Sequence, residues 1–193
     1  MAEPPKEGTV HRPHAARNAG GRRWWRWLRD IGLLVLVFVV IQWWQSRDLV
    51  EGPAPPLVGH LLDGSPFQLT AMQRPVLVHF WATWCPICRL GQGGIASIAA
   101  DWPAITIATT SGSADEVAGY LREDGLTMPV LLDENGDIAR HWGVYGVPAT
   151  FIVDGDNMIR YAGMGYATEI GLRLRLWLTR LLHKGGPVAA LDG

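Results

Sequence analysis

The sequence predicts an α/β domain, a β-sheet covered by helices, that follows one membrane-spanning helix near the N-terminus. Short apolar segments of strand character alternate with segments of helical periodicity from about residue 58, and a hairpin and a helix close the series. These two observations predict the domain. An apolar run between clusters of tryptophan and arginine predicts the span.

Residues 1–23 are rich in Pro, Gly, Ala and Arg and have almost no large apolar side chains, which predicts a disordered cytoplasmic tail. Binding to nucleic acid is not indicated, because the net charge of the chain is −1 and the basic residues of the tail are scattered. Seven Lys or Arg residues precede residue 30, five of them in the tail: Lys6, Arg12, Arg17, Arg22, Arg23, Arg26 and Arg29.

Residues 24–45 are predicted to form a transmembrane signal anchor in the lipid bilayer. The uninterrupted apolar run, 31–41, is short beside the roughly 20 residues that a spanning helix needs, but the flanking tryptophans extend it to that length. A cleaved signal peptide is the alternative, yet Gln-Trp-Trp-Gln follows the run where small residues would be needed. A buried core helix fits less well, because the run is apolar all round and is bracketed by arginine and tryptophan.

The excess of basic residues before the span predicts a single-pass protein of the bacterial inner membrane, with its N-terminus in the cytoplasm and its catalytic domain in the periplasm. Residues 46–57 are predicted to be a proline-rich linker, since three prolines favour an extended, stiff geometry. The domain is expected to occupy residues 58–183, and residues 184–193 to form a flexible tail.

The first half of the domain alternates strand and helix. Two short strands within residues 60–69 are expected to flank the Asp63-Gly64 turn. Residues 75–82 predict a buried strand, because they are too apolar to alternate. A helix is expected over about 86–100, and the next strand over 105–109.

The second half continues the alternation. Residues 115–123 predict a helix, with Ser113 as its candidate N-cap and Glu116 three residues later. Residues 130–133 predict a short strand that ends at the Asn-Gly turn of residues 135–136.

The last elements are a hairpin and a helix. Residues 150–153 and 158–161 are expected to pair around the turn of residues 154–157. The helix over 169–183 is predicted from the helical spacing of Ile170, Leu174, Trp177, Leu178 and Leu181. Core packing is expected for Trp81, Trp102, Trp142 and Trp177.

The only two cysteines, Cys85 and Cys88, enclose Pro86 and Ile87 at the junction of a predicted strand and helix. The free amides at a helix N-terminus stabilise an anion, which lowers the pKa of a cysteine there and favours its reactive thiolate. Pro86 suits the first helical turn. We expect Cys85 to be exposed and to attack the disulfide of a partner, and Cys88 to resolve the mixed disulfide. No cofactor is expected beyond a redox-active Cys85–Cys88 disulfide.

A metal site and a purely structural disulfide are the alternative interpretations of this motif. A structural zinc site needs four ligands, whereas the chain has no second cysteine pair and its six histidines are dispersed. A structural disulfide would close a loop too small to restrict the unfolded chain much. The motif therefore favours thiol–disulfide exchange, and no metal site is predicted.

The motif and its surroundings resemble the thioredoxin superfamily. Residues 80–88 (FWATWCPIC) are similar to its active-site stretch, and residues 143–150 (GVYGVPAT) to its cis-proline loop. The separation of about 60 residues is similar to that of the membrane-anchored TlpA-like branch, which includes cytochrome c maturation thioredoxins and the ScsD-like proteins linked to copper tolerance. The resemblance covers roughly residues 56–183, leans toward the ScsD-like group and implies a thioredoxin-like fold, a central mixed sheet flanked by helices.

The resemblance also implies how partners are bound. The Val147–Pro148 bond is expected to be cis, and Val147 to offer its backbone N–H and C=O to an extended substrate strand. Pro148 is expected to keep metal-binding groups away from the cysteines. Trp84, with Pro86 and Ile87, is expected to support the site and to offer an apolar surface.

Two positions depart from the family pattern. His79 stands where thioredoxins carry a buried Asp, and Gly91 where cytochrome c maturation members often carry a Glu. His79 is therefore a candidate proton relay, since its unperturbed pKa is about 6.5; the alternative is a satisfied core histidine. Gly91, Gly93 and Gly94 should each weaken the helix by about 1 kcal/mol relative to Ala.

The expected function is an extracytoplasmic thiol–disulfide oxidoreductase that acts on the thiols and disulfides of other proteins. A reductase serving cytochrome c maturation or copper stress is favoured, with electrons from a membrane donor of the thiol-reductase type. The alternative is a copper-binding or copper-delivery module on the same fold, because soft thiolates select Cu(I). The cysteine spacing of two intervening residues and Pro148 favour exchange.

Overall fold

The computed structural model describes residues 24, 27–34, 36, 37, 40, 52–72 and 75–182. The predicted tails, 1–23 and 184–193, and much of the predicted anchor and linker lie outside these residues. Residues 27–34 are helical and exposed. Among the described residues, no helix is both long and apolar enough to cross a membrane.

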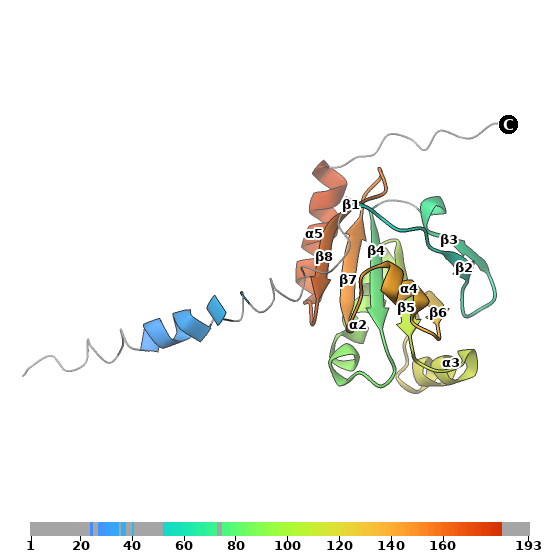
Figure 1. The fold of residues 1–193 in the computed structure, drawn as a ribbon, viewed down its shortest axis with the longest axis horizontal. Coiled ribbons are helices and arrows are strands. Elements are labelled where there is room, and N and C mark those ends of the chain that lie inside the picture. The colour runs from blue at the N-terminus through green and yellow to red at the C-terminus, as the bar shows by residue number, and fades with distance from the viewer. Residues whose placement is uncertain are drawn as a thin grey trace, which may run out of the picture. The chain divides into compact units, whose positions relative to one another are not determined.

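A six-stranded mixed sheet forms the centre of the domain, in the order β1–β8–β7–β4–β5–β6 (Figure 1). β4, β5 and β6 are parallel, whereas β7 and β8 run antiparallel to their neighbours. The strands are β1 (Gly52–Pro53), β4 (Val76–Trp81), β5 (Ala104–Thr109), β6 (Val130–Asp133), β7 (Ala149–Val153) and β8 (Met158–Met164). A two-stranded ribbon, β2 (Val58–His60) and β3 (Pro66–Gln68), flanks the predicted Asp63-Gly64 turn. The thioredoxin-like α/β fold is therefore confirmed.

Four α-helices and one 3₁₀ turn complete the domain: α2 (Pro86–Asp101), α3 (Ala114–Glu123), α4 (Asp137–His141), α5 (Glu169–Leu182) and η1 (Leu69–Ala71). The predicted helices α2, α3 and α5 are confirmed. At the start of α3, the Ser113 and Glu116 side chains each accept a hydrogen bond from the backbone N–H of the other, which is the predicted capping box.

α4 was not predicted. Gly136 has a φ of 71°, a left-handed conformation that glycine adopts without strain, and it turns the chain out of β6. The buried Asp133 then accepts hydrogen bonds from the backbone N–H groups of Ile138 and Ala139, at 2.9 and 3.0 Å. These two bonds satisfy amides that a helix start leaves without partners.

The sheet carries apolar side chains on both faces, and β4 shows how they divide. Val78 and Phe80 lie in the cluster that contains Trp142 and Phe151. Leu77 lies in the cluster formed with α2 and α5. Because side chains alternate along a strand, His79 shares the face of Leu77, beneath α2 and α5.

The glycines of α2 allow other segments to approach it closely. A Cβ atom at Gly94 would lie 3.2 Å from the Cβ of Glu169, and one at Gly91 would lie 3.6 Å from the ring of Tyr166. A Cβ at Gly93 would meet nothing within 4 Å, and no feature of the structure explains this glycine.

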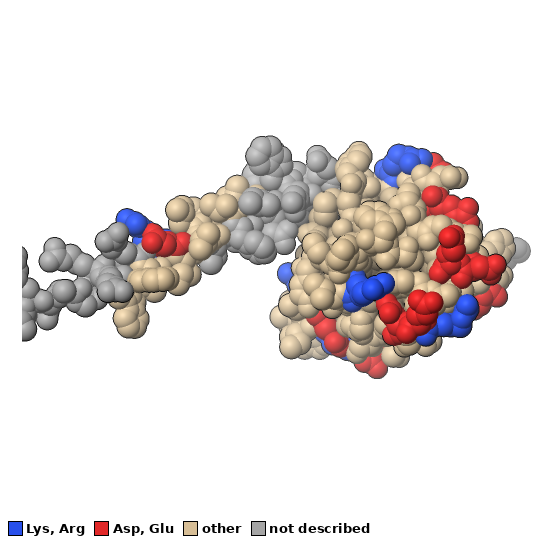
Figure 2. Space-filling view, turned by 90° about the horizontal axis from the view of Figure 1, so that it is seen from below, with Lys and Arg blue, Asp and Glu red and all other residues tan. Residues whose placement is uncertain are grey.

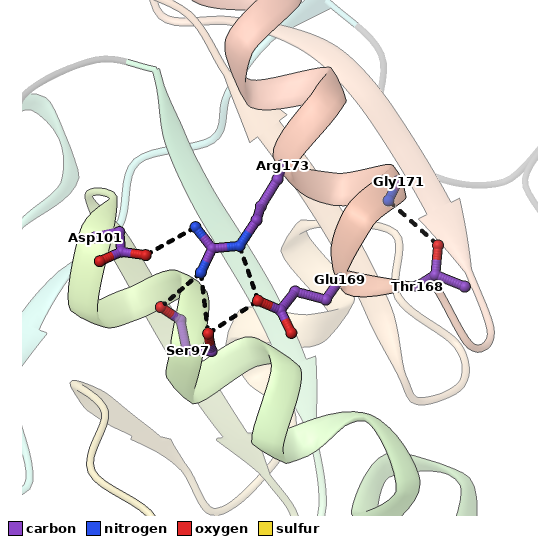
Figure 3. A network of polar contacts seen from close by, with 6 residues as sticks. All are labelled: Ser97, Asp101, Thr168, Glu169, Gly171 and Arg173. Carbon is purple, nitrogen blue, oxygen red and sulfur yellow. Dashed lines mark hydrogen bonds and ion pairs between the residues drawn. The ribbon is translucent and has the colours of Figure 1, made fainter.

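α2 and α5 are joined by the side chain of Arg173 (Figure 3). Its guanidinium forms ion pairs with Asp101 at 2.9 Å and with Glu169 at 2.8 Å, and it donates to Ser97. Ser97 in turn donates to Glu169. The network fixes the first turn of α5 against the last turn of α2.

Two sequence expectations need correction. The domain extends beyond residue 58 toward the N-terminus, at least to Gly52, because β1 pairs with β8 and Ala54 and Leu57 are buried; the second half of the predicted linker is therefore part of the domain. Trp177 does not pack in the core: it is 51 % exposed, and α5 buries Leu172 and Leu176. The alternating Arg-Leu sequence of residues 173–176 places leucines on both faces of the helix, with Leu174 exposed and Leu176 buried.

Candidate active site

Cys85 is the N-cap residue of α2, directly after β4 and a short turn. Its extended backbone (φ −92°, ψ 107°) points its sulfur at the first turn of the helix, where the backbone N–H of Cys88 donates to Sγ at 3.1 Å. Pro86 takes the first helical position. Cys85 and Cys88 form a disulfide, with their Cα atoms 5.3 Å apart.

The two sulfurs are less accessible than the sequence suggested. Cys85 is 5 % exposed and Cys88 is 1 % exposed, so the expectation of an exposed Cys85 is wrong for the disulfide form. The carbonyl oxygen of Val147 lies 3.7 Å from Cys85 Sγ and covers it from the opposite loop. Cys85 is still the more accessible of the two.

The Val147–Pro148 peptide bond is cis, as the resemblance implies. Pro148 precedes β7, and its carbonyl accepts a hydrogen bond from the backbone N–H of Gly165 at 2.7 Å. This bond ties the cis-proline loop to the segment that links β8 with α5. The loop therefore has a fixed position in front of the disulfide.

Exposed apolar side chains lie on the segments that carry the disulfide and the cis-proline loop, and on the segment after β8. Trp84 is 63 % exposed, and its ring is held in place because Nε1 donates to the carbonyl of Thr110 at 3.0 Å. We call the exposed members Trp84, Ile87, Leu90, Tyr145 and Tyr166 the apolar rim. Figure 2 views the molecule from the end at which β4 terminates, and a broad part of this face carries no charged side chains.

His79 lies behind Cys88 in the core. It is opposite Thr150 in the antiparallel register of β4 and β7, and its Nδ1 is 2.9 Å from Thr150 Oγ1. Burial lowers its pKa to about 4, so the imidazole is neutral at pH 7. A cavity of about 10 Å³, close to the smallest volume that holds one water, is lined by His79, Cys88, Pro148, Thr150 and Tyr166 among others.

Thr150 and Tyr166 were not predicted as site residues. Thr150 enters the site only through strand register, and Tyr166 through the close approach of its ring to Gly91. The one signal in the sequence for either residue was Gly91, which stands where cytochrome c maturation members often carry a Glu.

The basic residue that follows Cys88 is bound by side chains at the C-terminal end of α3. Arg89 donates to Tyr120 Oη at 3.4 Å and forms an ion pair with Asp124 at 3.6 Å, and the hydrogen bond to Tyr120 raises the pKa of Arg89. Tyr120 also donates to the buried Gln92 at 2.6 Å. In the described part of the chain, no group of three or more His, Cys, Asp or Glu residues is arranged to hold a metal ion.

Comparisons with known proteins agree with this geometry. The thiol:disulfide interchange protein DsbE of Escherichia coli K12 is 28% identical over 163 residues, which cover 75% of this chain and 85% of that protein. A thioredoxin-like protein of Haemophilus influenzae is 28% identical over 152 residues, covering 75% of this chain and 89% of that protein.

Solved structures show the same fold. A secreted Mycobacterium tuberculosis disulfide oxidoreductase superimposes with a TM-score of 0.55 at 23% identity, covering 63% of this chain and 95% of that one. The exposed lipoprotein thioredoxin Etrx1 of Streptococcus pneumoniae gives a TM-score of 0.57 at 20% identity, covering 64% of this chain and 99% of that one. The AhpC/TSA family model matches residues 50–162, more than half of the sequence. The chain therefore belongs to the AhpC/TSA family, and its fold is thioredoxin-like.

Proposed function

We propose that this chain is an extracytoplasmic protein thiol–disulfide oxidoreductase that works as a reductase through Cys85 and Cys88. The observation that carries the proposal is the position of Cys85: it caps α2, accepts from the amide of Cys88 and faces the cis-proline loop at Val147. The relatives named for thiol:disulfide interchange support the same enzyme class.

The proposed reaction passes two electrons to a partner. The thiolate of Cys85 attacks one sulfur of the partner's disulfide, so that a mixed disulfide forms and the partner's other sulfur leaves as a thiolate that takes up a proton. Cys88, deprotonated, then attacks Cys85 Sγ and releases the partner's first sulfur. The partner is left with two thiols, and this chain with the Cys85–Cys88 disulfide seen in the structure. A dithiol donor in the membrane would return it to the reduced form.

His79 is the proposed acceptor for the proton of Cys88. Both residues line the same small cavity, and the neutral imidazole has a nitrogen available to take a proton. Thr150 engages Nδ1 and so holds the ring in one orientation, with Nε2 as the other nitrogen. The imidazole would thus replace the buried carboxylate of thioredoxins.

The surroundings of Cys85 favour the reducing direction. A strongly stabilised thiolate makes a dithiol a poor reductant, and cations beside the sulfur are a common source of that stabilisation. Here Arg89 is engaged by Tyr120 and Asp124, and His79 is neutral at pH 7. The Val147 carbonyl oxygen, 3.7 Å from Sγ, disfavours a negative charge on the sulfur. The amide of Cys88 gives Cys85 one neutral donor.

The proposed location rests on the sequence. Residues 24–45 would anchor the chain in the bacterial inner membrane, with the domain in the periplasm, where partner proteins carry disulfides. Two structural relatives are described as secreted or exposed proteins, which supports an extracytoplasmic site of action. Cytochrome c maturation or copper stress is the proposed context.

A disulfide-reduction assay with the full chain tests the proposal. The reduced chain should reduce insulin disulfides in stoichiometric amounts, and Cys85→Ser should abolish this reaction. Titration with Cu(I) in parallel tests the copper alternative. Tight stoichiometric Cu(I) binding by a chain that reduces no disulfide would overturn the proposal in favour of copper delivery.

A further inference from the structure

One face of α5 carries a row of large apolar side chains that the domain does not cover. Ile170, Leu174, Trp177 and Leu181 recur at the spacing i, i+4, i+7 and i+11, so they form one straight row on the helix. Their exposed fractions are 82, 54, 51 and 48 %. We call these four residues the α5 stripe; Leu178 and Leu182 extend it on one side.

The α5 stripe lies opposite the buried face of the helix. Leu172, Leu176 and Thr179 face the core, so the packing of the domain leaves the stripe uncovered. An amphipathic helix normally turns its apolar residues inward. α5 instead has two apolar faces, and the outer one needs its own explanation.

Arginines border the α5 stripe on both sides. Arg173 and Arg180 lie along one edge of the helix, and Arg175 lies along the other. The aromatic rings of the domain hold two of these cations in place: the guanidinium of Arg175 is 4.5 Å from the ring centre of Tyr161, and that of Arg180 is 5.8 Å from the ring centre of Trp102.

We infer that the α5 stripe inserts into the interface of a bilayer that contains anionic lipids and so holds the domain against the membrane surface. A helix with Trp and Leu on one face and arginines beside it is the pattern of helices that lie in the membrane interface. The guanidinium groups of Arg175 and Arg180 complement lipid phosphates, while the apolar side chains enter the region below them. Arg173 does not take part, because Asp101 and Glu169 already pair with it.

The length of the chain before the domain supports this occupant. Six residues, 46–51, separate the proposed anchor from Gly52, and six residues span at most about 20 Å. An anchored domain is therefore always close to the lipid surface. The closeness of the domain to the lipid rests on the proposed anchor, whereas the pattern of side chains on α5 is independent of it.

A second copy of the chain fits the α5 stripe less well. Stable dimers usually bury 20–30 residues on each side, about 800 Å² per partner, whereas the stripe and its extension supply six residues. A paired helix seam needs at least three heptads, and the stripe covers fewer than two, from residue 170 to residue 181.

Site-directed spin labelling of the full chain in vesicles tests the inference. A nitroxide is attached at Leu174→Cys in a chain with Cys85→Ser and Cys88→Ser, and its collisions with oxygen and with a water-soluble nickel chelate are compared. Vesicles of phosphatidylcholine with phosphatidylglycerol should give more collisions with oxygen than with nickel at residue 174. The matched control is Glu123→Cys at the exposed end of α3, which should give the opposite ratio.

The outcomes separate this inference from the proposed anchor. A label at residue 174 that collides mainly with nickel, on a chain that stays with the vesicles after an alkaline wash, overturns the inference and leaves the anchor standing. A chain that the alkaline wash removes, but whose label enters the lipid at low salt, overturns the anchor and supports the inference. Dipolar broadening between labels at residue 174 would show that a second copy of the chain covers the α5 stripe, and this result would overturn the inference.

Discussion

His79 Nδ1 and Thr150 Oγ1 lie 2.9 Å apart in the core, on neighbouring antiparallel strands and directly behind the redox disulfide. His79 occupies the position at which thioredoxins carry a buried Asp. A buried imidazole is neutral in the resting state, so it places no charge in the core, and it can still take up a proton during the reaction.

The burial of His79 makes stability depend on pH. Its pKa is about 4 in the folded chain and about 6.5 when unfolded, so between these values the unfolded state binds the additional proton. Stability should therefore fall as the pH is lowered from about 6.5 to about 4, by about 3 kcal/mol from this residue. Urea unfolding of wild type and of His79→Gln at pH 7 and pH 4.5 measures it. The variant should lose less stability than wild type; equal losses would show that His79 is not the group that titrates.

The same substitution should slow exchange. If His79 accepts the proton of Cys88, His79→Gln should reduce the rate of mixed-disulfide resolution at pH 7, but by less than the roughly 100-fold that is the lower end of general-base effects, because a pKa of about 4 makes the imidazole a weak base. Raising the pH of the solution should restore the rate, since hydroxide then deprotonates Cys88 directly. Stopped-flow kinetics from pH 6 to 10 give the profile. Thr150→Val is the second variant, because it leaves the imidazole in place and removes only its orienting hydroxyl. An unchanged rate in His79→Gln would make His79 a core residue only.

The order of attack can be read from trapped intermediates. Cys88→Ser should accumulate a mixed disulfide through Cys85, because the sulfur that would resolve it is missing. Cys85→Ser should accumulate none, since Cys88 is 1 % exposed. Non-reducing gels after reaction with an oxidised model protein show both. Equal trapping by the two variants would mean that either cysteine can attack.

The glycines of α2 offer a matched pair for stability. Gly93→Ala should stabilise the chain by about 1 kcal/mol, because alanine favours the helix and nothing lies within 4 Å of the new Cβ. Gly94→Ala should gain less or destabilise, because its Cβ would lie 3.2 Å from Glu169, which the Arg173 network holds in place. Thermal unfolding of both variants tests this. A larger gain at Gly94 than at Gly93 would contradict the tight packing of α2 against α5.

The sequence was sufficient for most of the sheet and for the centre of the site. The buried strand β4, the capping box at Ser113 and the hairpin after β7 follow from local patterns, and all are present. Cys85 at a helix start also follows, since strand and helix signals meet there. The site roles of Pro86, Ile87 and Trp84 remain predictions.

The features that the sequence missed depend on one local side-chain contact and on contacts between distant segments. The start of α4 is stabilised by Asp133, five residues before its hydrogen-bond partner Ile138, and no apolar period marks so short a helix. The pairing of His79 with Thr150 needs the register of two strands that are 71 residues apart. The face that α5 buries could not be read from its sequence, because leucines occupy both sides and only packing against the sheet and α2 selects one.

The reduction potential of the Cys85–Cys88 pair tests the central claim most directly. The full chain is equilibrated with thiol buffers of known potential, and its free thiols are counted after alkylation. We predict a two-electron transition near that of thioredoxin, about −270 mV, as a reductase requires. A value near that of the strong periplasmic oxidant, about −120 mV, would contradict the proposal and make the chain a disulfide donor.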